Sequence, residues 1–199
     1  MTTNLSRLYD TNAEAQRVIT DLKNAGIPES DISLIANSGE NAETISDAAE
    51  GASTGAGLGA AVGGGAGLLA GLGVMAIPGV GPVVAAGWMA ATLTGLVAGA
   101  VTGAAAGGIV GALTDSGVDE SDAHVYAESI RRGGSLVLVK TSDLHQAVAK
   151  NVLDRHSSVA LSDRRSTYEG EGWSRFDDKR GPYSPNDNAA SRSNQTGMM

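Results

Sequence analysis

The centre of the sequence reads AIPGVGPVVAAGW at residues 76–88. Its turn-forming residues are Pro78, Gly79, Gly81 and Pro82. Proline stops a helix and glycine permits a tight reversal, so we expect a turn here between two apolar arms of twenty residues, Leu58–Ile77 and Val83–Thr102. A helix of that length is about 30 Å long, which matches the hydrocarbon core of a bilayer. The pattern predicts a helical hairpin long enough to span a membrane.

The hairpin lies within a run of 64 residues, between Glu50 and Asp115, that contains no Asp, Glu, Lys, Arg or His. Glycine recurs at every fourth position along both arms, with Ala91 filling one place in the second arm, and residues four apart share nearly one face of a helix. Such a face lets another helix backbone approach closely, as in a glycine zipper. The predicted helix-packing residues are Gly51, Gly55, Gly59, Gly63, Gly67, Gly71, Gly87, Gly95, Gly99, Gly103, Gly107 and Gly111.

Trp88 stands beside the proline turn, near the start of the second arm. In a bilayer, an indole at this place is an interfacial anchor. In a soluble hairpin, the same ring packs against the opposite arm. Both interpretations stay open.

The flanks of the uncharged run have the pattern of a small α+β domain. Thr11 and Glu14 form a capping box at the start of a helix, and Asp119 starts a helix after the run. The expected strands are Leu5–Tyr9, Ile32–Ala36, Leu136–Lys140 and Ser158–Leu161, and a last helix, capped by Ser142 and Asp143, buries Leu144, Ala147, Val148 and Val152. The order predicts a ferredoxin-like antiparallel sheet, βαβ–insert–αβαβ, interrupted by the hairpin.

These patterns divide the chain into four parts. The first half of the domain and an acidic linker occupy residues 1–50, the hairpin 51–114, the second half 115–163, and a tail 164–199. The tail is rich in Gly, Ser, Asn, Pro and mixed charge, which is typical of disorder. Four of the seven aromatic residues are spaced along it: Tyr168, Trp173, Phe176 and Tyr183.

Composition excludes several classes of function. The net charge of −8, without a cluster of Lys or Arg, argues against nucleic-acid binding, because phosphates must be neutralised. The absence of cysteine excludes disulfides, thiolate metal sites and a cysteine nucleophile. The N-terminus has no apolar segment of the kind found in signal peptides, so we expect the folded domain to face the cytoplasm.

The motifs resemble those of the bacterial general stress protein 17M-like, or heat-induced stress protein, family, in a long form with a central glycine-rich segment. The resemblance covers about residues 4–162. It is carried by Leu8-Tyr9-Asp10-Thr11, Gly26-Ile27-Pro28, the run at 76–88, Ala123-His124-Val125-Tyr126-Ala127-Glu128 and Gly133-Gly134-Ser135-Leu136. It implies a stress-associated protein without established catalysis, and no site residues follow from it.

The sequence predicts no cofactor, metal or catalytic site. The glycine runs lack the strand and the following acid of a dinucleotide fold, so we expect no cofactor. His124, His145 and His156 lack metal-ligand spacing, so no metal site is expected, and His124 is interpreted as part of a solvated helix face. Arg131 and Arg132 are interpreted as compensating a helix dipole. We expect no catalytic residues.

The function expected from these features is a non-enzymatic stress-response protein that forms homo-oligomers at the inner membrane, with membrane lipid as a partner and the folded domain on the cytoplasmic side. Acidic flanks oppose membrane binding, since Glu50 and Asp115 bound the run without nearby Lys or Arg. The alternative is a soluble, cytoplasmic self-assembly or partner-binding module in which the hairpin packs in a protein interface.

Overall fold

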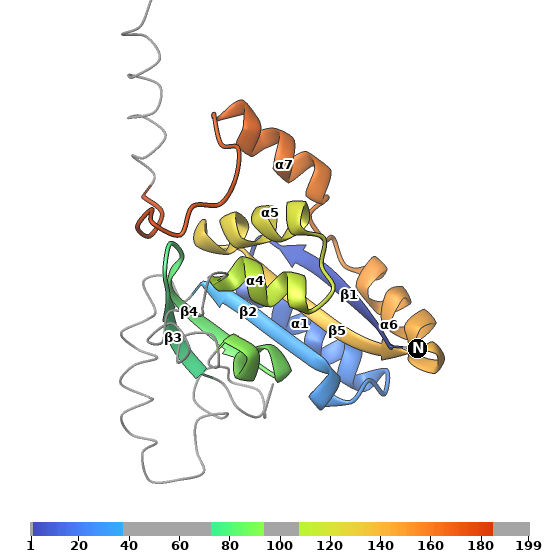
Figure 1. Ribbon diagram of the computed structural model, residues 1–199. Coiled ribbons are helices and arrows are strands. Elements are labelled where there is room, and N and C mark those ends of the chain that lie inside the picture. Colours follow the sequence, from blue (N-terminus) through green and yellow to red (C-terminus); the bar gives the residue numbers. More distant parts are fainter. Residues whose placement is uncertain (1, 38–72, 94–107, 185–199) are drawn as a thin grey trace, which may run out of the picture.

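The computed structural model describes residues 2–37, 73–93 and 108–184, which form an α+β fold (Figure 1). Within these ranges, one antiparallel sheet has five strands in the order β1-β5-β2-β4-β3. The strands are β1 Thr2–Tyr9, β2 Ile32–Asn37, β3 Gly73–Ile77, β4 Gly81–Ala86 and β5 Ser135–Ser142. The predicted class, α+β with an antiparallel sheet, is confirmed.

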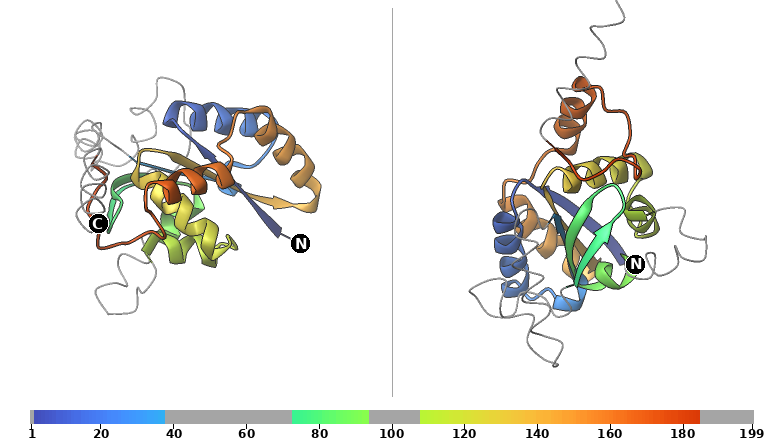
Figure 2. Two further views of the ribbon diagram at one scale, coloured as in Figure 1. Left: turned by 90° about the horizontal axis from the view of Figure 1, so that it is seen from above. Right: turned by 90° about the vertical axis from the view of Figure 1, so that its left-hand side faces the viewer.

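The helices cover both faces of this sheet (Figure 2). They are α1 Asn12–Asn24, α4 Gly108–Asp115, α5 Glu120–Arg131, α6 Asp143–Arg155 and α7 Leu161–Gly170, with a 3-10 turn at Glu29–Asp31 and a helical segment at 88–93. Side chains alternate between the faces. Leu8 joins the core under α4 and α5, whereas Tyr9 joins the core under α1 and α6.

Local sequence signals explain α1. Thr11 is its N-cap, and its hydroxyl accepts a hydrogen bond of 3.2 Å from the Glu14 N–H. Val18, Ile19 and Leu22, which recur at helical spacing, are fully buried. The predicted helix start at Thr11 is confirmed, and the Thr11 hydroxyl also donates to the Glu14 carboxylate at 3.1 Å.

Strand β5 joins the two halves of the chain. It pairs with β1, where Leu8 lies opposite Leu136, and with β2, where Leu34 lies opposite Val137. The segments before and after the central run therefore build one sheet.

The predicted helical arms are wrong at residues 73–77 and 83–86, because residues 73–86 form a β-hairpin, whereas residues 88–93 of the second arm are helical. The expected reversal is present, but it joins two strands: the Val80 N–H donates to the Ile77 carbonyl at 3.1 Å, and Gly79 has φ +78°. Proline followed by a glycine at positive φ is typical of a type II turn. β4 also pairs with β2, so the sheet satisfies backbone groups that a helix would have satisfied internally.

The glycine stripe falls largely outside the described residues. Those outside are Gly51, Gly55, Gly59, Gly63, Gly67, Gly71, Gly95, Gly99, Gly103 and Gly107. Gly87 lies at the joint between β4 and the helical segment, with φ +78°, and a Cβ there would lie 2.1 Å from the Ile32 carbonyl oxygen. Gly87 is therefore needed at a strand–helix joint. Gly111 lies in α4, where an added Cβ would meet no described atom within 4 Å.

The ferredoxin-like order is not confirmed. The predicted strand Ser158–Leu161 is reduced to one bridge, in which the Val159 N–H donates to the Leu8 carbonyl at 2.8 Å. Leu161 already begins α7, and β3 and β4 extend the opposite side of the sheet.

The predicted inward face of α6 is partly wrong. Leu144 is 81% exposed, and Ala147 and Val148 are also exposed. The side chains that are buried are Ala149, Val152 and Leu153. Both sets have helical spacing, so periodicity alone does not choose between them. The observed rotation also brings the Asp154 carboxylate within 3.0 Å of Arg7 in β1.

Candidate functional site

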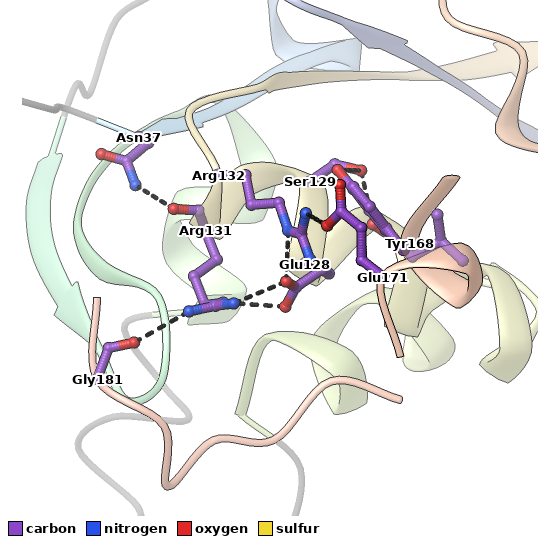
Figure 3. Close-up of polar contacts among 9 residues, drawn as sticks. Asn37, Glu128, Ser129, Arg131, Arg132, Tyr168, Glu171 and Gly181 are labelled. Atoms are coloured by element: carbon purple, nitrogen blue, oxygen red, sulfur yellow. Dashed lines mark hydrogen bonds and ion pairs between the residues drawn. The ribbon is translucent and has the colours of Figure 1, made fainter. Parts of the chain in front are cut away.

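The most polar buried cluster lies at the end of α5, and Figure 3 shows its contacts. Arg131 donates two hydrogen bonds to Glu128, with Nη2 at 2.7 Å from Oε1 and Nε at 2.9 Å from Oε2. The two side chains are only 2% and 1% exposed. A buried pair with this forked geometry holds its partners in a defined orientation.

Arg132 extends the pair into a network. Its Nε donates to the Glu128 carboxylate at 2.6 Å, and its Nη1 donates to Glu171, which follows α7. Burial disfavours the charge of Arg132, but the hydrogen bonds that it donates to Glu171 and Glu128 raise its pKa. Two cations and two anions balance, so the network is a neutral clamp between α5 and the segment after α7.

The prediction of a disordered tail is wrong for residues 164–184. Tyr168, Trp173 and Phe176 are at least 93% buried. The Tyr168 and Trp173 rings meet edge to face at 5.7 Å, and the Tyr168 hydroxyl donates to Ser129 in α5 at 3.1 Å. These apolar and polar contacts outweigh the cost of ordering a polar segment.

The same segment continues past α7 and reaches the hairpin. The Gly181 carbonyl accepts a hydrogen bond from Arg131, and the Tyr183 ring lies 5.2 Å from the Arg131 guanidinium. At the turn, a Cβ on Gly79 would lie 2.6 Å from the Asp178 Cα. Residues 161–184, which we call the C-terminal strap, thus connect α5 to the tip of the β3–β4 hairpin.

A groove of about 460 Å³ lies between α4 and the C-terminal strap. His124 lines it, and its side chain is only 14% exposed, so the predicted solvated face is wrong at this residue. Arg175 contacts His124 Nε2 at 3.3 Å. Because arginine can only donate, Nε2 accepts and the neutral ring carries its proton on Nδ1. Burial, and then the Arg175 charge, lower the His124 pKa.

The chemistry available in this groove is limited. His124 Nδ1 has no hydrogen-bond partner among the described residues, but it is fully covered, so a molecule in the groove does not reach it. Across the described ranges, no group of three His, Asp or Glu side chains is placed to hold a metal ion.

The hairpin residues singled out in the sequence come together at one end of the sheet. Pro78 and Gly79 lie in the turn, and Gly81 and Pro82 begin β4. Trp88 is partly buried against the core, and the Lys140 ammonium lies 3.9 Å from its ring centre. Whether Trp88 also anchors at a membrane stays a prediction.

The clamp was missed by reasoning from the sequence alone, where Arg131 and Arg132 were assigned to a helix dipole. A signal was present, because Glu128 precedes the two arginines by three and four residues, which places all three on one helix face. Local spacing does not reveal that the aromatic residues of the strap bury these three side chains.

In the described parts of the chain, no helix has both the length and the apolarity needed to cross a bilayer.

Comparisons with known proteins match the chain in two segments. Residues 5–75 match the heat induced stress protein YflT domain, and residues 84–167 match a protein family of unknown function, DUF1269. Searches of curated proteins and of solved structures gave no match. The matched segments are separated by the turn of the β3–β4 hairpin, and their strands interleave in one sheet. Together, the two matches place the chain in a general stress protein family, as its motifs indicated.

Proposed function

We propose that this stress-response protein acts without catalysis, by self-association of its copies through the uncharged central part of the chain. The observation that carries the proposal is the position of the β3–β4 hairpin. It lies within the 64 uncharged residues, and it forms one side of the sheet rather than the core of a separate helical unit.

Electrostatics support this choice of contact. Copies with a net charge of −8 repel one another, and repulsion weakens association wherever acidic surfaces meet. The central run contributes no charge of its own, so contact between the runs of two copies adds no repulsion from residues within them. The clamp and the strap contain their own balanced charges and do not need a second chain.

A second candidate is a membrane-associated form of the same role, at the inner membrane with the folded domain in the cytoplasm. It rests on residues 51–72, which are uncharged and largely apolar. The acidic residues that bound the run oppose it, because anionic lipid repels them. Recovery of the protein in the pellet after a carbonate wash would favour the membrane form, and recovery in the supernatant the cytoplasmic one.

The proposal is tested by chemical crosslinking and sedimentation of the full chain. We expect a concentration-dependent oligomer. Replacing Gly63 and Gly99 with leucine tests the stripe, because bulky side chains separate closely packed helices. The control replaces Ala61 and Ala98, which lie off the stripe, with leucine.

If the stripe forms the contact, the glycine pair loses association and the alanine pair retains it. Equal behaviour of the two pairs would exclude the stripe as the contact. A chain that stays monomeric at every concentration would contradict the proposed function.

A further inference from the structure

We infer that β3 is the contact strand, and that β3 of a second copy of this chain pairs with it antiparallel to extend the sheet across two molecules. The inference names the contact for the self-association proposed above, and it rests on that proposal. An edge strand presents backbone N–H and C=O groups that another strand can bind.

The two edge strands of the sheet, β1 and β3, differ in how far they are protected against pairing with another strand. Beside β1, the Val159 N–H already bonds to Leu8, and Arg7 adds a charge to the strand. β3 has a paired neighbour on one side only, β4, among the described residues. Its sequence, GVMAI, contains no charge and no proline, which are the features that usually block edge pairing.

The register of the hairpin shows which groups face outward. Ala76 lies opposite Pro82, which has no N–H, so this cannot be a pair that exchanges two hydrogen bonds. Because the two kinds of pair alternate, the bonded pairs are Ile77 with Gly81 and Met75 with Val83. The backbone groups of Val74 and Ala76 therefore point away from β4.

This alternation selects one register for two copies. If Val74 of each copy lies opposite Ala76 of the other, all four outward residues exchange hydrogen bonds. The two-fold axis then passes between the two Met75 residues, which form a non-bonded pair with Cα atoms about 4.5 Å apart. Because β3 and β4 are uncharged, this dimer brings no acidic side chains of the two hairpins together.

The first test is Ala76→Pro, measured by sedimentation velocity of the full chain. Proline removes the outward N–H without removing a bond to β4. We expect the dimer dissociation constant to rise at least tenfold. Ala76→Thr, which keeps the N–H at this exposed position, should leave it nearly unchanged.

A second test does not depend on the fold of a proline variant. The chain contains no cysteine, so a single introduced cysteine is a specific reporter. Met75→Cys should form a disulfide-linked dimer on mild oxidation, because the predicted Cα separation lies within disulfide range. Ala160→Cys, exposed beyond the other edge of the sheet, should stay monomeric.

The outcomes separate the two proposals. A wild-type chain that is monomeric at every concentration would overturn both. An oligomer that folded Ala76→Pro leaves intact, or a Met75→Cys variant that crosslinks no better than Ala160→Cys, would overturn the β3 contact and leave self-association standing.

Discussion

The C-terminal strap and the β3–β4 hairpin attach to the same domain by opposite chemistry. The strap is polar in sequence, yet it is held by buried ion pairs and aromatic rings around Glu128 and Tyr168. The hairpin is uncharged, and it is held by backbone pairing with β2 and by glycines in special conformations. The strap pairs its charges within one chain, whereas β3 of the hairpin has a paired strand on one side only among the described residues.

The largest effect is expected at the clamp. Glu128→Gln leaves two arginines without their shared carboxylate in a buried site, which costs about 3–5 kcal/mol of unfolding free energy. Urea denaturation followed by circular dichroism measures this loss. Glu169→Gln, which removes an exposed carboxylate of α7, is the control and should change stability by less than about 0.5 kcal/mol. Equal small effects would contradict a clamp that holds the strap.

The stability of the β3–β4 hairpin is expected to depend on the backbone conformation of Gly87 rather than on ion pairs. Gly87→Ala adds a Cβ close to the Ile32 carbonyl oxygen at a positive φ, which costs roughly 2–4 kcal/mol in thermal unfolding. Gly111→Ala is the matched change in the same glycine stripe. It adds a Cβ into open space on α4, so it should stabilise the protein by up to about 1 kcal/mol. Equal destabilisation by both would support a common helix-packing role instead.

A smaller effect is expected at His124, where the strap crosses α5. Its folded-state pKa lies below the ordinary value of 6.5, first because of burial and then because of Arg175. The folded state therefore loses stability as the pH falls from about 6.5 through this lowered pKa, because the unfolded chain binds the proton more readily. At higher pH the stability of the folded state is retained. In an NMR titration, Arg175→Gln should raise the His124 pKa, whereas Lys179→Gln in the same strap should not. A His124 pKa that Arg175→Gln leaves unchanged would refute this contact.

The smallest effect is expected on α6. Leu144→Ser changes a side chain that is 81% exposed, so unfolding free energy should shift by less than about 0.5 kcal/mol. Leu153→Ala, in the buried face of the same helix, should cost about 2–5 kcal/mol. A larger loss of stability for Leu144→Ser than for Leu153→Ala would instead support the buried face of α6 that the sequence predicts.

Elements with strong local signals could be predicted. The Thr11 cap, the Asp119 cap and the buried strand around Leu136 are correct, because each signal lies within a few residues of the element it sets. The presence of the flanking strands in one antiparallel sheet was also predictable, from the order of strands and helices along the chain.

The centre could not be predicted in the same way. The residues before and after Pro78 are almost all apolar, so they fit the periodicity of a helix and that of a strand equally well. Only the pairing of β4 with β2 decides that they form strands. The prediction of disorder failed in the strap for a related reason. The polar composition of the strap is typical of disorder, but Tyr168 and Trp173 also pack against α5, which lies far away in sequence.

The central claim, that copies associate through β3, is tested most directly by amide hydrogen exchange at increasing protein concentration. We expect the Val74 and Ala76 amides, which point away from β4, to exchange more slowly as the concentration rises. The Tyr168 amide, inside helix α7, should not change. Val74 and Ala76 amides that exchange at a constant rate while sedimentation shows an oligomer would contradict the claim.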